Sequence, residues 1–412
     1  MFRRIYLDNS ATTAIDPEVL EAMMPYLTGK FGNASSIHHF GQQTRSAVDK
    51  ARHQVAALLN ARPNEVVFTS GGTESNNLAI RGLIERSGDT LVPMSAKHEQ
   101  FSPTDHVRGV QIPHIITSSI EHPAVKEVCA DLEKLGCEVT YLPVYENGLV
   151  RFEDIKTAVR NNTSLITIMV ANNEIGTLQP VEEIGKLVRE LRANGQKIWF
   201  HTDAVQAVGK VNVDVEAIGC DLLSISGHKI HAPKGIGALY VRRGTRLHAQ
   251  NIGGRQERGI RGGTEPVAQI VALGKAAELA GERLNENAVS LRVLRDDLEQ
   301  RVFENVDGAV LNGDRENRLP NISNISFSGI EGEGLLINLD MQGIAVSTGS
   351  ACSSGSLEPS PVIRALGREE DLARGAIRFS LGKENTPEDI NRLLEILPAS
   401  VENLRRLAPP KI

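Results

Sequence analysis

From about residue 16 onward, short runs of apolar and β-branched residues alternate with longer segments of helical periodicity. Such alternation is typical of a mainly parallel sheet whose strands are joined by helices that cover both of its faces. Seven runs have the length and composition of strands, and they lie at residues 66–70, 114–118, 138–142, 165–170, 197–202, 221–226 and 236–241. The pattern therefore predicts an α/β fold with these seven strands in one sheet.

The last third of the chain is organised differently. A long helical stretch at 270–304 precedes strand-like runs near 322–327, 344–347 and 376–380 and helical segments near 333–341 and 386–404. This order of elements predicts a smaller α+β domain, and 412 residues are enough for two or three domains. We expect residues 15–268 to form the large domain, and residues 1–14 and 269–412 to form the small one.

Charge and hydropathy exclude several classes of protein. The chain carries 45 Lys and Arg residues against 51 Asp and Glu residues, a net charge of -6, and the two signs are interspersed. We therefore expect no direct contact with nucleic acid. The first residues contain no apolar signal segment, and no run of about 18 apolar residues occurs. We expect a cytoplasmic protein without a membrane partner.

The four cysteines are too few and too scattered for a secreted disulfide framework, which favours a reducing compartment. Cys129 lies on the apolar face of a predicted helix, and Cys137 and Cys220 open strand-like runs, so we interpret these three as core residues. Cys352 differs, because the surrounding residues 347–357, S-T-G-S-A-C-S-S-G-S-L, are mostly small and polar. An exposed thiol of this kind is a candidate nucleophile.

A first chemical signal is the run V-V-F-T-S-G-G-T-E-S-N-N-L at 66–78, where a strand breaks at two glycines and a helix begins near Thr73. Small residues let backbone N–H groups approach an anion, and the helix N-terminus adds partial positive charge. The turn is therefore a candidate phosphate cup. An ordinary strand-to-helix turn explains this run equally well.

A second signal comes from two neighbouring strands. The run W-F-H-T-D at 199–203 ends in Asp203, and the run L-L-S-I-S-G-H-K at 222–229 ends in Lys229. Ligands of open α/β sheets bind at the carboxyl ends of the strands, so both side chains should face one crevice; a structural ion pair is the alternative. A lysine, a carboxylate and an anion cup are what pyridoxal phosphate requires. The residues therefore predict this cofactor.

The chain resembles, over nearly its whole length, the cysteine desulfurases within the class V aminotransferase family, which are fold type I pyridoxal-phosphate enzymes. The stretches that carry the resemblance are Y-L-D-N-S-A-T-T (6–13), G-N-A-S-S-I-H (32–38), T-S-G-G-T-E-S-N-N (69–77), E-H-P-A (121–124), A-N-N-E-I-G-T (171–177), H-T-D-A-V-Q (201–206), S-I-S-G-H-K (224–229), G-I-R-G-G-T (259–264), G-S-A-C-S-S-G (349–355) and R-F-S-L-G (378–382). It implies a fold type I large domain that binds the cofactor and a small domain that carries the cysteine loop.

The resemblance also implies a role for each matching residue. Lys229 would form the Schiff base and move protons, Asp203 would hold the ring nitrogen, and His122 would stack on the ring and act in acid–base steps. Gln206 would bind the ring oxygen. The residues expected at the phosphate are Gly72, Thr73, Ser226 and His228, together with Thr264 from the other subunit of a homodimer. Asn173, which also contacts the cofactor, and Arg378 would bind the substrate carboxylate. Cys352 would take the sulfur of L-cysteine as a persulfide and leave alanine.

The implied activity supplies sulfur for iron–sulfur clusters or for thiolated tRNA and cofactors, through a sulfur-acceptor protein that is either an iron–sulfur scaffold or a sulfur carrier. No metal site of the chain's own is expected, although Cys352 is a candidate shared ligand of an iron–sulfur cluster. Alternatives are a selenocysteine lyase or another class V enzyme such as an aminotransferase, and a sulfur-carrier or scaffold protein. Residues 86–113 lengthen the chain before the E-H-P-A motif, and we interpret them as a surface insertion that serves partner binding.

Overall fold

The computed structural model describes residues 4–85, 112–349 and 358–407. Its largest sheet has seven strands in the order β2-β8-β7-β6-β5-β3-β4. The bounds of these strands are β2 Val66–Thr69, β3 His114–Ser118, β4 Glu138–Leu142, β5 Thr163–Thr167, β6 Trp199–Asp203, β7 Leu222–Ser226 and β8 Gly237–Val241. Strands β3 to β7 pair in parallel, and β8 is antiparallel to both neighbours. The predicted, mainly parallel seven-stranded sheet is confirmed.

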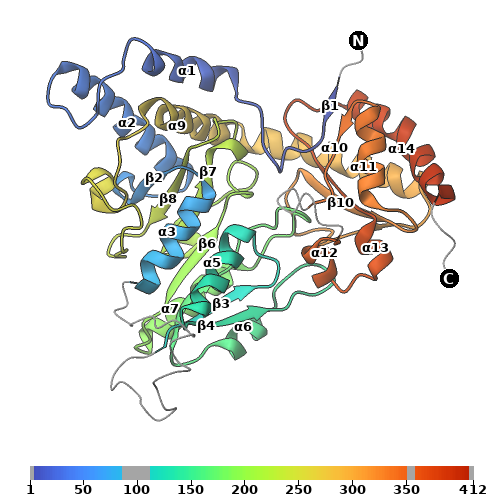
Figure 1. The fold of residues 1–412 in the computed structure, drawn as a ribbon, viewed down its shortest axis with the longest axis horizontal. Helices are drawn as coiled ribbons and strands as arrows, with labels where there is room; N and C mark the ends of the chain where they lie inside the picture. Colours follow the sequence, from blue (N-terminus) through green and yellow to red (C-terminus); the bar gives the residue numbers. More distant parts are fainter. Residues whose placement is uncertain (1–3, 86–111, 350–357, 408–412) are drawn as a thin grey trace.

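Helices cover both faces of this sheet (Figure 1). The helices are α1 Pro17–Leu27, α2 His39–Leu58, α3 Gly72–Ile84, α5 Pro123–Lys134, α6 Phe152–Ala158, α7 Val181–Ala193, α8 Val215–Ile218 and α9 Val267–Glu282. Successive strand residues point to opposite faces. Val67 and Ile115 accordingly pack with α3 and α5, whereas Phe68 and Ile116 pack in the core that includes α2, α7 and α9. Strands buried on both sides explain the continuous apolar runs of the sequence.

Three cysteines lie in this apolar interior. Cys129 on α5, Cys137 before β4 and Cys220 before β7 are buried, as the sequence predicts. Burial raises the pKa of the Cys129 thiol to about 12. Burial also raises the pKa of the Cys220 thiol, so these two thiols are protonated at neutral pH. Cys352 and all but the last two residues of the predicted insertion at 86–113 lie outside the described residues.

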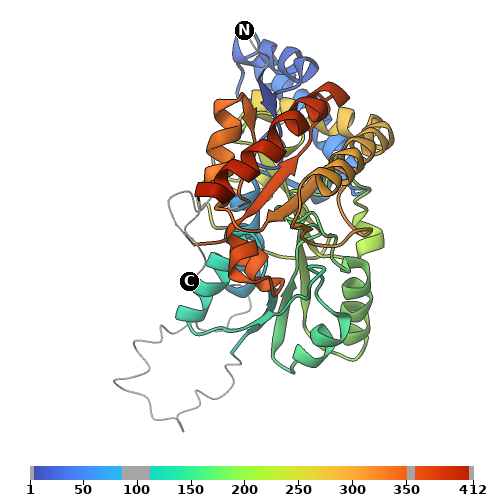
Figure 2. The same cartoon turned by 90° about the vertical axis from the view of Figure 1, so that its right-hand side faces the viewer.

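A second core lies beside the first (Figures 1 and 2). Its sheets are antiparallel β12-β10-β9 and the parallel pair β1-β11. Its elements are β1 Ile5–Tyr6, β9 Ala309–Leu311, β10 Ile322–Phe327, β11 Ile344–Ala345, β12 Ala376–Ser380, α10 Leu284–Asn305, α11 Gly332–Met341 and α14 Pro387–Leu407, and the short helices α12 Pro361–Ala365 and α13 Glu370–Arg374 lie nearby. The smaller α+β unit is confirmed, and no helix of the described chain could cross a bilayer.

The predicted helical stretch at 270–304 consists of two helices that meet at Arg283. The buried residues of α9 belong to the core of the large sheet, whereas those of α10 belong to the smaller core. The Arg283 guanidinium forms ion pairs with Asp16 and Glu18 at the start of α1. The domain boundaries stay a prediction, and we propose that the division falls at Arg283.

Candidate active site

A cavity of about 430 Å³ lies at the carboxyl ends of β6 and β7, and residues of both cores line it. Ten of the predicted site residues line this cavity, namely Gly72, Thr73, His122, Asn173, Asp203, Gln206, Ser226, His228, Lys229 and Arg378. The first and last of them, Gly72 and Arg378, are more than 300 positions apart in the sequence, so the fold brings these residues together. Thr264 is exposed and does not line the cavity of its own chain.

Asp203 ends strand β6, and its carboxylate is held by two N–H groups. The side-chain amide of Asn76 donates to Oδ2 at 2.7 Å, and the backbone N–H of Val205 donates to Oδ1 at 2.9 Å. Asp203 is 7% exposed. Two such hydrogen bonds, one on each oxygen, fix the orientation of this buried carboxylate. A fixed negative charge therefore lies at the base of the cavity.

Lys229 follows strand β7 in a short 3-10 turn, Gly227–Lys229. The turn requires Gly227, because a Cβ atom there would lie 2.9 Å from the Ile236 side chain and 3.0 Å from its carbonyl oxygen. The Lys229 ammonium donates to the backbone carbonyls of Ser10 and Ala11. The N-terminal segment therefore holds this amine at the cavity wall.

The two histidines of the cavity are neutral at physiological pH. Burial lowers the pKa of His122; Asp203 opposes this shift and Lys229 adds to it. Burial and the neighbouring ammonium of Lys229 lower the pKa of His228 to about 4. His122 caps α5, because its Nδ1 accepts from the Ala124 N–H at 3.1 Å. In a neutral imidazole the proton then lies on Nε2.

The N-terminus of α3 forms one wall of the cavity. The first intrahelical bond runs from Ser75 N–H to Gly71 O at 3.0 Å, so the preceding amides of the helix have no carbonyl of their own to bind. A Cβ atom at Gly72 would lie 2.8 Å from Val205 Cγ2. The close approach of the backbone to the Val205 loop thus depends on glycine. The arrangement is suited to a phosphate group.

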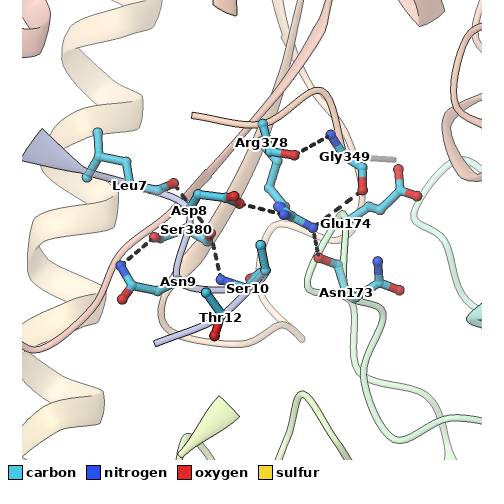
Figure 3. Close-up of polar contacts among 12 residues, drawn as sticks. Leu7, Asp8, Asn9, Ser10, Thr12, Asn173, Glu174, Gly349, Arg378 and Ser380 are labelled. Carbon is cyan, nitrogen blue, oxygen red and sulfur yellow. Dashed lines mark hydrogen bonds and ion pairs between the residues drawn. The ribbon is translucent and has the colours of Figure 1, made fainter. Parts of the chain in front are cut away.

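Arg378 is on β12 in the smaller core, is 2% exposed, and reaches into the cavity (Figure 3). Its Nη2 donates to Asp8 Oδ1 at 2.7 Å, and its Nη1 donates to the carbonyl oxygens of Asn173 at 2.9 Å and Gly349 at 3.4 Å. Its Nε is buried and has no hydrogen-bond partner among the described residues. The guanidinium is held in place and still has an unused donor.

Sequence reasoning assigned no role to three further residues of the cavity, Asn76, Glu121 and Glu174. All three stand inside motifs that carry the family resemblance, and that position was the only available signal. Glu121 Oε1 accepts from Ser118 Oγ at 2.7 Å and from Met169 N–H at 3.0 Å, whereas its buried Oε2 has no partner among the described residues. Burial raises the pKa of Glu121 to about 8, and the Asp203 charge adds to the shift.

Comparisons with known proteins show the family of the chain. The family model described as aminotransferase class V matches residues 5–112 and 110–393. The chain is 49% identical over 411 residues to cysteine desulfurase IscS of Dictyoglomus turgidum. The alignment covers 100% of this chain and 98% of that protein. A solved structure of a NifS-like protein has a TM-score of 0.85 at 35% identity and covers 97% of this chain and 100% of that chain. Another, SspA in complex with cysteine, has a TM-score of 0.77 at 37% identity, with coverages of 92% and 98%.

Similarity of this extent shows the family to which the chain belongs. The cavity contains the predicted Asp203, Lys229 and Arg378. Members of this family depend on pyridoxal phosphate. The chain belongs to the class V aminotransferase family, and within it to the cysteine desulfurases.

Proposed function

We propose that the chain binds pyridoxal phosphate in the cavity of about 430 Å³ and removes sulfur from L-cysteine there. The observation that carries the proposal is the meeting of Asp203 and Lys229, from adjacent strand ends, with the free amides of α3. Unused polar atoms support it, because Gln206 Oε1 and Asn76 Oδ1 are buried without a hydrogen-bond partner among the described residues. Buried polar groups need such partners, and a polar ligand would supply them.

The predicted residues of the cavity then have defined roles toward the cofactor. The first-turn amides of α3, with Ser226 and His228, would bind the phosphate, and Asp203 would hold a proton on the ring nitrogen. The bound cofactor supplies an electron sink for bonds at the substrate's α-carbon. Lys229 is the amine that would hold the cofactor and then move a proton at that carbon. His122 would stack on the ring and present its Nε2 proton to the reacting groups.

The smaller core would supply the substrate contacts. Arg378, with its unused Nε–H, and Asn173 would bind the carboxylate of L-cysteine. The Cys352 thiol would then accept the sulfur atom. The carbon–sulfur bond of L-cysteine breaks, a sulfur–sulfur bond forms on Cys352, and the carbon gains a proton to give L-alanine. The persulfide would pass to an acceptor protein, an iron–sulfur scaffold or a sulfur carrier.

A homodimer is part of the proposal. An apolar surface of α1 and the following segment to α2 exposes Leu20, Met24, Leu27, Phe31, Ile37 and Phe40. Exposed apolar side chains that gather in this way mark protein contacts. Thr264 is exposed and lies away from its own cavity, so it is free to reach the phosphate site of a second subunit.

Three measurements test the proposal. Purified protein loaded with pyridoxal phosphate should release alanine from L-cysteine, and with dithiothreitol present to reduce the persulfide it should release an equal amount of sulfide. After borohydride reduction and denaturation the cofactor should stay attached to the wild type and to Lys126→Ala, a second lysine of the same cavity, but not to Lys229→Ala. Cys352→Ala should keep the cofactor and lose sulfide release, whereas Cys137→Ala should keep both.

The opposite outcomes contradict it. Full sulfide release by Cys352→Ala would exclude the persulfide, and reduced cofactor attached to Lys229→Ala would exclude the lysine assignment. A monomer in analytical ultracentrifugation, with full activity, would exclude a role for Thr264 in a partner's site.

A further inference from the structure

Glu174 contacts described residues on both sides of the segment 350–357, which contains Cys352. On one side, Ser360 Oγ donates to Glu174 Oε2 at 2.6 Å. On the other side, Gly349 packs so closely on the same oxygen that a Cβ atom at this position would lie 2.5 Å from it. One carboxyl oxygen thus contacts Gly349, the residue before this segment, and Ser360, three residues after it. Figure 3 shows Glu174 beside Gly349 and Asn173.

The backbone of Glu174 is itself held by both cores. Its N–H donates to Asn172 Oδ1 at 2.8 Å within a turn of the larger core. Its carbonyl oxygen accepts from Asn324 Nδ2 at 3.3 Å, on strand β10 of the smaller core. A side chain on so constrained a backbone is a rigid anchor. The contacts to Ser360 and Gly349 therefore have a fixed origin.

Arg378 adds a third tie at the same place. Its Nη1 donates to Gly349 O at 3.4 Å and to Asn173 O at 2.9 Å, and its backbone pairs with Ser347. The residue that would bind the substrate carboxylate is thereby linked to the start of the segment and to the neighbour of Glu174. These contacts fix Arg378 relative to Gly349 and Asn173.

A carboxyl group is a costly choice for this position. Glu174 is 5% exposed, and burial raises its pKa, while the Ser360 hydrogen bond and the charge of Arg378 oppose that shift. Residues that fill space alone need no buried carboxyl group. The free-energy cost of burying this carboxyl group is explained if Oε2 of Glu174 is needed for the contacts to Ser360 and Gly349.

We propose that Glu174 is a positioning residue whose side chain fixes Gly349 and Ser360, which flank the segment 350–357, relative to Arg378, so that sulfur transfer to Cys352 depends on it. The inference rests on the proposed function, because it assumes that Cys352 accepts the sulfur. It extends that function to a residue that touches neither the sulfur nor the thiol.

The test separates sulfur transfer from the chemistry that does not need Cys352. Exchange of the α-hydrogen of L-alanine with deuterated water, followed by proton NMR, needs the cofactor and Lys229 but no thiol. Glu174→Ala, loaded with pyridoxal phosphate, should keep this exchange within about twofold and lose sulfide release by about tenfold or more, because a displacement of about 1 Å can cost about a hundredfold. Glu174→Gln keeps an acceptor for Ser360 and should recover most of the sulfide release.

Two further variants guard against a trivial loss of folding. Gly349→Ala acts on the other end of the segment, where φ is +94° and the added methyl group would collide with Oε2, and it should show the same selective loss. Ser400→Ala removes a comparable buried hydroxyl bond of 2.7 Å to Asn338 in the smaller core and should change neither rate.

Equal losses of exchange and sulfide release in Glu174→Ala would overturn the inference, and so would sulfide release within about twofold of the wild type. A failure of the proposed function has a different signature, since the wild type itself would then form no persulfide on Cys352.

Discussion

Replacement of Glu121 by glutamine should make the protein progressively more stable than the wild type as the pH rises. In the folded protein burial raises the pKa of Glu121 from 4.5 to about 8, so the carboxyl group keeps its proton where the unfolded chain has lost it. A raised pKa gives stability that is fully present below pH 4.5 and is lost as the pH rises toward 8. Glutamine has no proton to lose, so its contribution does not change.

The size of the effect follows from the shift. Each pH unit between the two pKa values changes the free energy of unfolding by about 1.4 kcal/mol, so the wild type should lose about 4 kcal/mol relative to Glu121→Gln between pH 5 and pH 8. The Oε1 contacts to Ser118 and Met169 can be made by the amide oxygen of glutamine, so the variant should fold normally.

Urea denaturation of both proteins at pH 5, 6, 7 and 8 measures the difference in the free energy of unfolding. The same substitution at exposed Glu286 serves as the control and should leave the difference from the wild type constant. A constant difference for Glu121→Gln as well would refute the reasoning, because the carboxyl group would then ionise in the folded protein as it does in the unfolded chain.

Three other variants test single contacts. Gly72→Ala places a methyl group 2.8 Å from Val205 Cγ2, and the overpacking of about 1–3 kcal/mol should weaken cofactor binding about tenfold or more in a fluorescence titration of the apoprotein. Arg378→Lys removes the fork but keeps the charge; it should raise KM for L-cysteine about tenfold while the cofactor absorbance stays unchanged. Arg52→Met breaks the buried ion pair with Glu257, 2.7 Å long, and should cost about 3–5 kcal/mol in urea denaturation with little change in KM.

The central sheet and the strand-end residues could be predicted because their signals are local. The apolar run that ends in Asp203 and the run that precedes Lys229 are each visible within ten residues, and parallel strands place such ends at one edge. The burial of Cys129 likewise follows from helical periodicity. Local patterns therefore predicted the architecture, Asp203, Lys229 and the turn before α3, whereas the other predicted residues of the cavity came from the family resemblance.

Contacts between distant segments could not be predicted in this way. Asn76 binds Asp203 across 127 positions, and Ser360 binds Glu174 across 186 positions, and nothing in either local sequence indicates the partner. The division of the helical stretch 270–304 into two helices at Arg283 likewise involves contacts with a distant segment. Gly281 is the only local signal near the break, which coincides with the ion pairs that Arg283 forms with the start of α1.

The electrostatics of the cavity follow from the different settings of two carboxyl groups. Each oxygen of Asp203 accepts an N–H bond, whereas both hydrogen bonds to Glu121 fall on Oε1 and leave Oε2 without a donor among the described residues. The Asp203 charge also raises the pKa of Glu121, so ionisation of the first group favours the neutral form of the second. The cavity thus keeps one negative charge where a protonated ring nitrogen would bind. Glu121 is a neutral neighbour that does not compete for that proton.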